Sequence, residues 1–215
     1  MDEVVQVLLS FRRQLRAVLL ACLLLSAGGV ASGAEPSVTV AVAQSGKAFV
    51  VDATVDAPVS VGTAWGVLTD FDHMTAILGN LTSSKVVSRD GNTLVVRQQG
   101  VARYGFLSIA FESEREMRLE PMKRILAHGL SGSVKRMDSE AKFFAVGQGT
   151  QIRYHAEVEP DSVLARMFGA PFVRHEVEEQ FVLMSREMLR RQPRPSADSS
   201  PVPQPAGETS LAQVR

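Results

Sequence analysis

The sequence predicts an α+β fold in which an antiparallel sheet of about seven strands packs against one long C-terminal helix. Three observations support this prediction. Apolar residues recur every three or four positions over residues 172–191, which is the period of a helix. Segments of alternating polarity, separated by turn residues, fill most of residues 49–159. The connections between these segments are too short for parallel crossovers, so neighbouring strands are expected to be antiparallel.

The N-terminus has the layout of a secretory signal peptide. Arg12, Arg13 and Arg16 precede an apolar run over residues 17–25, and small residues follow as far as Ala34. We predict cleavage after Ala34 and a periplasmic or secreted protein. A transmembrane anchor needs about 20 apolar residues, so no stable membrane span is expected once the signal is removed.

Cys22 is the only cysteine of the chain. Residues 19–22 resemble a lipoprotein cleavage box, but the apolar stretch between Arg16 and Cys22 is short, so simple cleavage is the preferred interpretation. Because Cys22 leaves with the signal, the mature chain is expected to have no disulfide and no thiolate nucleophile.

The first elements after the signal are expected to be a loose leader, a strand and two short helices. Residues 35–48 are poor in large side chains and are assigned to the leader. Polar and apolar residues alternate over residues 49–56, which predicts a strand with one buried face. Ser60 can cap the first helix, and a second short helix is expected over residues 73–78.

Six further strands are expected, over residues 85–88, 93–99, 106–119, 124–130, 142–146 and 151–159. Asp90-Gly91-Asn92 is a strong hairpin signal between the first two. A second break is expected from Gly100 to Gly105. Each turn is followed at once by the next strand, which favours a meander.

The chain becomes helical after Pro160. Gly169-Ala170-Pro171 divides this region into a short piece and a helix over residues 172–191, roughly 30 Å long. Residues 192–215 contain five prolines among small and polar residues and are expected to form a disordered tail.

This order of elements resembles the helix-grip fold of the START-like (SRPBCC) superfamily over residues 49–191. Asp56-Ala57-Pro58, Val61 and residues 65–71 resemble its opening signature, and residues 149–160 resemble its last strand and the entry to its terminal helix. The group includes polyketide cyclases, coenzyme Q-binding proteins, lipid-transfer domains and plant pollen allergens. The resemblance implies a curved sheet around the long helix, with an apolar cavity between them.

Arg115 is the main candidate for a ligand contact. On the strand over residues 106–119, Glu112, Glu114 and Glu116 mark the wet face, so Arg115 lies in the opposite, apolar row. A buried guanidinium needs a partner, and an anionic or carbonyl head group of a ligand is one. Two other interpretations stay open: a bulge turns Arg115 outward, or an internal acid or the cavity mouth satisfies it. The other expected ligand contacts are Gln98, Ser113, Tyr154, Met74, Ile77, Leu78, Phe111 and Phe172.

The preferred functional interpretation is an exported protein that binds or transfers an apolar small molecule, such as a lipid, a quinone or a polyketide-like compound. No catalytic, metal-binding or cofactor-binding set is predicted, and the four histidines lack the spacing of a zinc site. Acidic and basic side chains number 23 each, so no excess charge indicates a nucleic acid partner.

Two alternatives remain. One is an enzyme of the cyclase or aromatase type, in which Arg115, Tyr104 or Tyr154 polarises a carbonyl group. The other is a non-enzymatic accessory protein of a periplasmic complex, with the proline-rich tail as a tether. The sequence identifies no protein partner.

Overall fold

The computed structural model describes residues 35–105, 107–160 and 163–193. Its elements follow in the order β1 (Ser37–Ser45), β2 (Ala48–Ala57), α2 (Val61–Leu68), η1 (Phe71–His73), α3 (Met74–Ile77), β3 (Leu81–Asp90), β4 (Thr93–Tyr104), β5 (Leu107–Glu120), β6 (Arg124–Gly132), β7 (Val134–Val146), β8 (Gly149–Pro160) and α4 (Val163–Arg191). The predicted signal peptide and most of the predicted tail lie outside the described residues. None of the described helices is long and apolar enough to cross a membrane.

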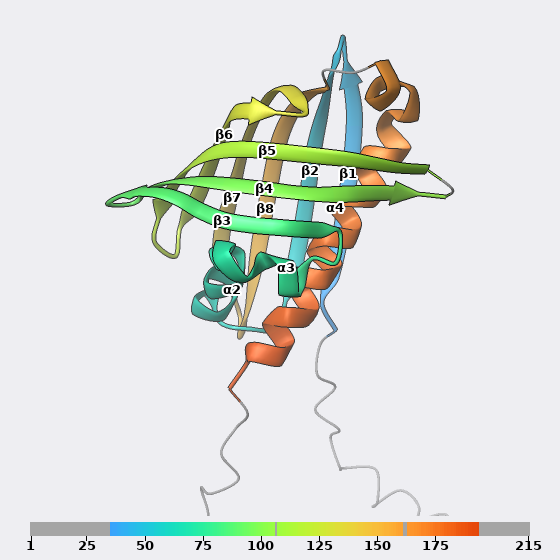
Figure 1. Ribbon diagram of the computed structural model, residues 1–215. Coiled ribbons are helices and arrows are strands. Elements are labelled where there is room, and N and C mark those ends of the chain that lie inside the picture. The colour runs from blue at the N-terminus through green and yellow to red at the C-terminus, as the bar shows by residue number, and fades with distance from the viewer. Residues whose placement is uncertain (1–34, 106, 161–162, 194–215) are drawn as a thin grey trace, which may run out of the picture. The chain divides into compact units, whose positions relative to one another are not determined.

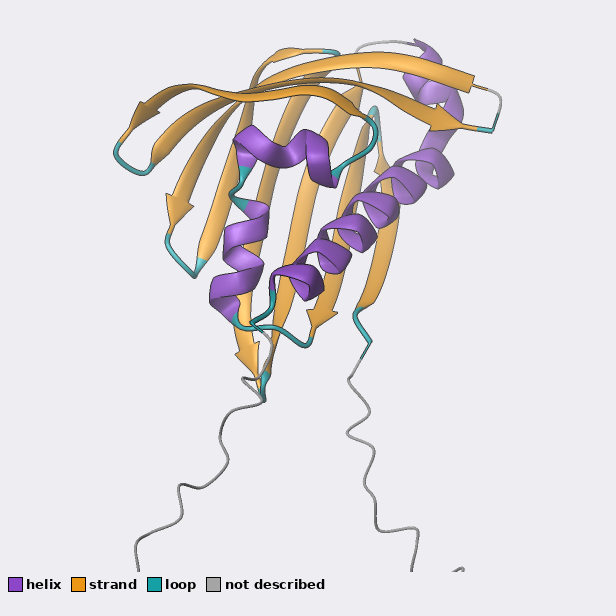
Figure 2. Ribbon diagram, turned by 60° about the horizontal axis from the view of Figure 1, so that its bottom comes forward, coloured by secondary structure: helices purple, strands orange, loops and turns teal. Residues whose placement is uncertain are grey.

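The eight strands form one sheet in the order β1-β2-β8-β7-β6-β5-β4-β3, and each neighbouring pair is antiparallel. In Figure 1, β3, β4 and β5 run across β1, β2 and β8, so the sheet is strongly curved. Figure 2 shows α2, α3 and α4 on its concave face. The predicted helix-grip fold is confirmed, with eight strands instead of seven and with the short helices after the second strand.

The additional strand corrects the prediction of a loose leader. Residues 37–45 form β1, which pairs with β2 from Ser37 opposite Asp56 to Ser45 opposite Ala48. Val40 is 5% exposed, and α4 packs against this strand. The sequence pattern of a strand is weak here because small residues alternate with the valines. The residues that bury these valines lie elsewhere in the chain.

The helix boundaries have local causes that the sequence contains. The Thr63 backbone N–H donates to the Ser60 Oγ at 3.1 Å, which caps α2 as predicted. Gly169 interrupts α4 with φ 63° and ψ −166°, a conformation that glycine adopts without a steric cost. The predicted break before the long helical segment is therefore present.

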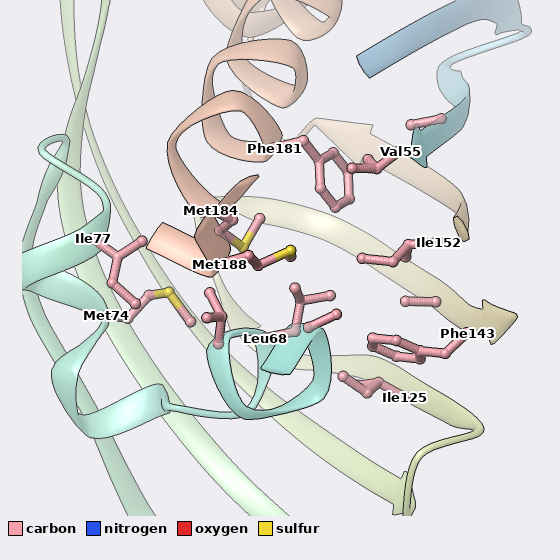
Figure 3. Close-up of a cluster of buried hydrophobic side chains, with 14 of the residues drawn as sticks. Val55, Leu68, Met74, Ile77, Ile125, Phe143, Ile152, Phe181, Met184 and Met188 are labelled. Atoms are coloured by element: carbon pink, nitrogen blue, oxygen red, sulfur yellow. The ribbon is translucent and has the colours of Figure 1, made fainter. Parts of the chain in front are cut away.

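The core fills the space between the concave face and the helices. Phe181, Met184 and Met188, from the predicted apolar stripe of α4, are at most 9% exposed. In Figure 3, Met184 and Met188 lie between Met74 of α3 and Ile152 of β8. The apolar stripe thus packs α4 against both the short helices and the sheet. The rest of the stripe packs against the margin of this core: Val173 and Val177.

Several strands are longer than predicted, among them β3, β4 and β7. β4 continues through Gly100 to Tyr104, so the expected break from Gly100 to Gly105 reduces to Gly105, whose φ is 60°. Gly100 is needed for a different reason: an added Cβ would overlap the Asn80 carbonyl oxygen and lie 2.7 Å from the Phe111 Cζ. β7 begins at Val134 instead of residue 142.

Candidate functional site

A small cavity lies between the concave face of the sheet and the helices, with a volume of about 140 Å³. Its apolar wall includes Leu68, Met74, Leu78, Met117, Ile125 and Phe181. Polar atoms reach it from five side chains: Gln98, Arg115, Ser139, Tyr154 and Gln180. A cavity of about 150 Å³ holds one benzene-sized molecule. As it stands, the site admits about one ring or a short chain with a head group.

A chain of hydrogen bonds fixes the polar end of the cavity. The Arg115 Nη2 donates to the Gln98 Oε1. The Gln98 Nε2 donates to the Ser84 Oγ at 3.0 Å, and the Ser84 hydroxyl donates to the Phe71 carbonyl at 2.5 Å. Gln98 and Ser84 are buried. Each link is oriented by the next, so the guanidinium is held in place against η1 through two neutral side chains.

Arg115 itself keeps unused hydrogen-bonding capacity. Its Nε is buried and has no hydrogen-bond partner in the described part of the chain. Burial lowers the pKa of Arg115, while the nearby Tyr154 opposes that shift. An arginine stays protonated in spite of such a shift, so the cavity contains a positive charge with a free donor.

The strand register explains why Arg115 points inward. A register shift does occur between Glu114 and Arg115, where β5 pairs with β6. The extra residue is on β6, because Glu114 faces Ser131 and Arg115 faces Gly129, which leaves Leu130 without a partner. β5 itself keeps its alternation, so the bulge does not turn Arg115 out of the cavity.

Tyr154 brings a second polar group to the same cavity. Its ring meets the Phe181 ring edge to face, with centroids 5.3 Å apart. Burial raises the pKa of Tyr154, while a hydrogen bond with Ser139 and the charge of Arg115 act against this shift. The phenol is therefore neutral at ordinary pH and able to donate a hydrogen bond.

The cavity contains five of the nine predicted contact residues, namely Arg115, Gln98, Tyr154, Met74 and Leu78. The other four do not line it. Ser113 faces Gln98 across β4 and β5 but lies beyond the cavity, and Phe111 packs over Gly100. Ile77 is buried in the core, and Phe172 is partly buried near the kink of α4. Ser113 and Phe111 share the strand phase of Arg115, but neither lines the cavity.

Sequence reasoning missed three polar residues of this site. Ser139 lies on the part of β7 that was not predicted as strand. Gln180 belongs to the long helix but lies outside its apolar stripe, and Ser84 lies just before the predicted start of β3. The sequence did contain a pattern that could have identified Ser139, because in a strand it points to the same face of the sheet as Ala141 and Phe143. Ser84 and Gln180 carry no such local signal.

Two other hollows differ from this cavity in chemistry. One, of about 490 Å³, is lined mainly by charged side chains of the outer face of the sheet, including Glu116, His128 and Glu157. The other, of about 340 Å³, lies between the end of α3, β4 and α4. Gln180 lines both this second hollow and the cavity, so the two are neighbours. Among these three hollows of the described residues, the cavity is the one that combines a mainly apolar wall with a largely enclosed charged side chain, that of Arg115.

The histidines pair with carboxylates at the surface. His73 lies 2.6 Å from Asp70, and His175 lies 3.9 Å from Glu179, one turn along α4. The described residues contain no group of three side chains able to hold a metal ion.

Comparison with known proteins identifies the family of this chain. The family model described as polyketide cyclase / dehydrase and lipid transport matches residues 48–190. The chain belongs to this START-like family. Family and fold together indicate a domain that binds hydrophobic ligands.

Solved structures with a similar fold have sequences that differ widely from this one. The Zhui aromatase/cyclase from Streptomyces sp. R1128 superposes with a TM-score of 0.60 at 17% identity, over 67% of this chain and 95% of that one. Human STARD10 gives 0.55 at 16% identity, over 74% and 71%. A START superfamily protein from Mycobacterium smegmatis gives 0.52 at 13% identity, over 66% and 96%. None of the curated proteins compared matches the sequence. At these identities the solved structures show the fold and leave the ligand open.

Proposed function

We propose that this protein binds or transfers an apolar small molecule that carries a carboxylate, phenolate or carbonyl oxygen, and that it does so outside the cytoplasm. One observation carries the proposal: an apolar cavity contains the Arg115 guanidinium with a buried, unpartnered Nε. Gln98 satisfies the Nη2, but a buried donor without an acceptor is destabilising, and a ligand oxygen would supply the acceptor that the Nε lacks. The family supports a hydrophobic ligand, and the N-terminal signal predicted from the sequence supports export.

The cavity volume constrains the ligand. Pockets for drug-sized molecules usually have about 300–1,000 Å³, so a complete lipid or quinone exceeds the 140 Å³ available. Met74 and Met184 line the wall from α3 and α4, and methionine side chains repack readily around different shapes. We expect the head group to bind beside Arg115 while the remainder passes Gln180 into the neighbouring hollow of about 340 Å³.

The proposal predicts a charge-dependent affinity. Arg115→Met removes the charge and keeps most of the side-chain length. We expect roughly tenfold weaker binding of an anionic probe such as decanoate and little change for the neutral analogue decanol, measured by isothermal titration calorimetry. Arg97→Met is the matched control, because Arg97 lies on the adjacent strand, points outward and pairs with Glu114.

Equal decanoate affinity in wild type and Arg115→Met would remove the head-group role. The broader proposal has its own test. Protein purified from its host would be examined by native mass spectrometry and solvent extraction, then tested against lipid, quinone and aromatic panels. An empty cavity together with no binding would contradict a ligand-carrying function.

A cyclase-type enzyme is the second candidate, favoured by the Arg115 guanidinium and the Tyr154 hydroxyl, which face one cavity. Two donors of this kind can polarise a carbonyl group of a bound polyketide-like chain. Incubation of a linear polyketide mimic with wild type, Arg115→Met and Tyr154→Phe distinguishes this activity from binding alone. Equal product in all three would remove the proposed role of Arg115 and Tyr154 in catalysis.

A further inference from the structure

The end of the sheet formed by the β5–β6 turn and the β7–β8 hairpin exposes apolar side chains without an assigned role. Met122 is 48% exposed, Phe144 39% and Val146 56%. We call these three residues the tip patch. They account for three of the five large apolar side chains that are exposed in the described part of the chain.

The backbone brings the tip patch together. The Phe143 N–H donates to the Lys123 carbonyl at 3.0 Å, so the β5–β6 turn lies against the end of β7. Met122 has a φ of 60°, the only positive φ among the described non-glycine residues. A left-handed methionine is unfavourable by about 1 kcal/mol or more, and the Met122 side chain is still 48% exposed.

Two cationic side chains border the tip patch. The Arg153 guanidinium lies over the Phe144 ring, 4.9 Å from its centroid. Lys123 is exposed beside Met122. Within the described residues neither of these two cations forms a direct ion pair, whereas Arg124 and Lys142 are paired with Glu120 and Glu140. The chain is neutral overall, but this end presents unpaired cations next to apolar side chains.

From these observations we infer that the tip patch docks on an anionic lipid bilayer. Three side chains at loop ends expose a few hundred Å² at most, which is below the roughly 800 Å² per partner of a stable protein–protein interface. Insertion into a bilayer surface needs no complementary partner, only exposed apolar groups flanked by lysine or arginine.

The course of the chain is consistent with this orientation. Ser37 faces Asp56, Ala57 faces Thr150, and Val146 faces Gly149. The first strand therefore begins at the same end of the sheet as the tip patch, the lower end in Figure 2. Cleavage after Ala34, as predicted, would leave a positively charged α-amino group close to Ser37.

A local probe tests the docking, because the N-terminal apolar segment of the full chain can itself bind vesicles. In a Cys22→Ser background, Val146→Cys and Val87→Cys are each labelled with the fluorophore NBD. Val87 is the matched control, since it is 45% exposed on β3 and lies outside the tip patch. Vesicles of phosphatidylcholine and phosphatidylglycerol are added to each protein.

We expect NBD emission at position 146 to shift to shorter wavelength while emission at position 87 stays unchanged. Met122→Ser with Phe144→Ser should weaken the vesicle affinity reported at position 146 roughly tenfold, with an unchanged circular dichroism spectrum. Vesicles of phosphatidylcholine alone should give a weaker response. Three results would overturn the docking: equal responses at positions 87 and 146, no response at position 146, or no effect of the double substitution. An equal response to vesicles of phosphatidylcholine alone would overturn the requirement for anionic lipid. The tip patch shares no residue with the cavity, so the two proposals fail independently.

Discussion

At the scale of single residues, the hydrogen-bonding capacity of the Arg115 guanidinium distinguishes the cavity from ordinary core. Its Nη2 is held by Gln98, which in turn is held by Ser84, so the group is pre-positioned before any ligand arrives. Pre-positioning reduces the conformational entropy lost on binding. Under the proposed function, the free Nε is the donor left for a ligand oxygen.

Glu176 provides a residue-scale prediction about pH. It accepts a hydrogen bond from the Asn80 Nδ2 at 3.3 Å, whereas the buried Asn80 Oδ1 has no partner in the described chain. Burial and the neighbouring Glu179 raise the pKa of Glu176 above 4.5. A protonated Glu176 could donate to that Oδ1; an ionised Glu176 cannot. The native state therefore favours the protonated form, and stability falls as the pH rises from 4.5 through the raised pKa.

We expect Glu176→Gln to be more stable than wild type at neutral pH by up to about 1 kcal/mol, because a glutamine amide can donate to Asn80 without a charge. The difference should vanish in acid. Urea denaturation at several pH values measures it. Glu178→Gln serves as control, since the Glu178 side chain is about half exposed and pairs with Arg174. A pH-independent difference for Glu176→Gln would contradict this account.

At the scale of elements, close approach of backbones decides where glycine is required. Asn80, the residue before β3, lies against β4 at Gly100, and the Val101 N–H donates to the Asn80 carbonyl at 2.8 Å. This contact holds α3 against the sheet and so forms one wall of the cavity.

Gly100→Ala should destabilise the protein by about 1–3 kcal/mol, because its Cβ would overlap the Asn80 carbonyl and the Phe111 ring. Gly66→Ala is the matched control. Gly66 lies in α2 with open space around the added Cβ, and the substitution should stabilise by about 0.5–1 kcal/mol through helix propensity. Denaturant midpoints of the two variants should move in opposite directions; a shift in the same direction would refute the steric argument.

At the scale of the whole molecule, one ionic network ties the end of α4 to the segment between α2 and η1. The Glu187 carboxylate contacts the Arg190 Nε and the Arg191 Nε at 2.6 Å each. Arg191 also contacts the Asp70 Oδ2 at 2.8 Å. The last turn of the helix is thereby fastened to the short helices that cover the cavity.

This network predicts an acid-sensitive contribution to stability. Its hydrogen bond from Arg190 is the main reason that the pKa of Glu187 is lowered from 4.5 to about 2. Because the folded-state pKa is depressed, the stabilisation is complete above 4.5 and is lost as the pH falls towards 2. Glu187→Gln should cost about 1–2 kcal/mol at neutral pH and almost nothing in strong acid. Thermal melting across this range measures it, and an equal cost at all pH values would show that the effect is not ionic.

The sequence by itself determined the elements whose causes are local. The α4 stripe that contains Phe181 and Met188, the Ser60 cap, the turn at Gly91 and the kink at Gly169 all depend on neighbours within a few residues. The inward phase of Arg115 belongs with them, because strand alternation is a local property.

The tertiary structure alone decided the remaining features. β1 is a strand because β2 and α4 cover it, and Gly100 is required because Asn80 passes over it. Ser84 meets Gln98 only after strands have paired. The extent of the cavity, which leaves out Phe172, depends on how the helices pack on the curved sheet. Each of these depends on contacts between residues distant in sequence, for which the local pattern carries no signal.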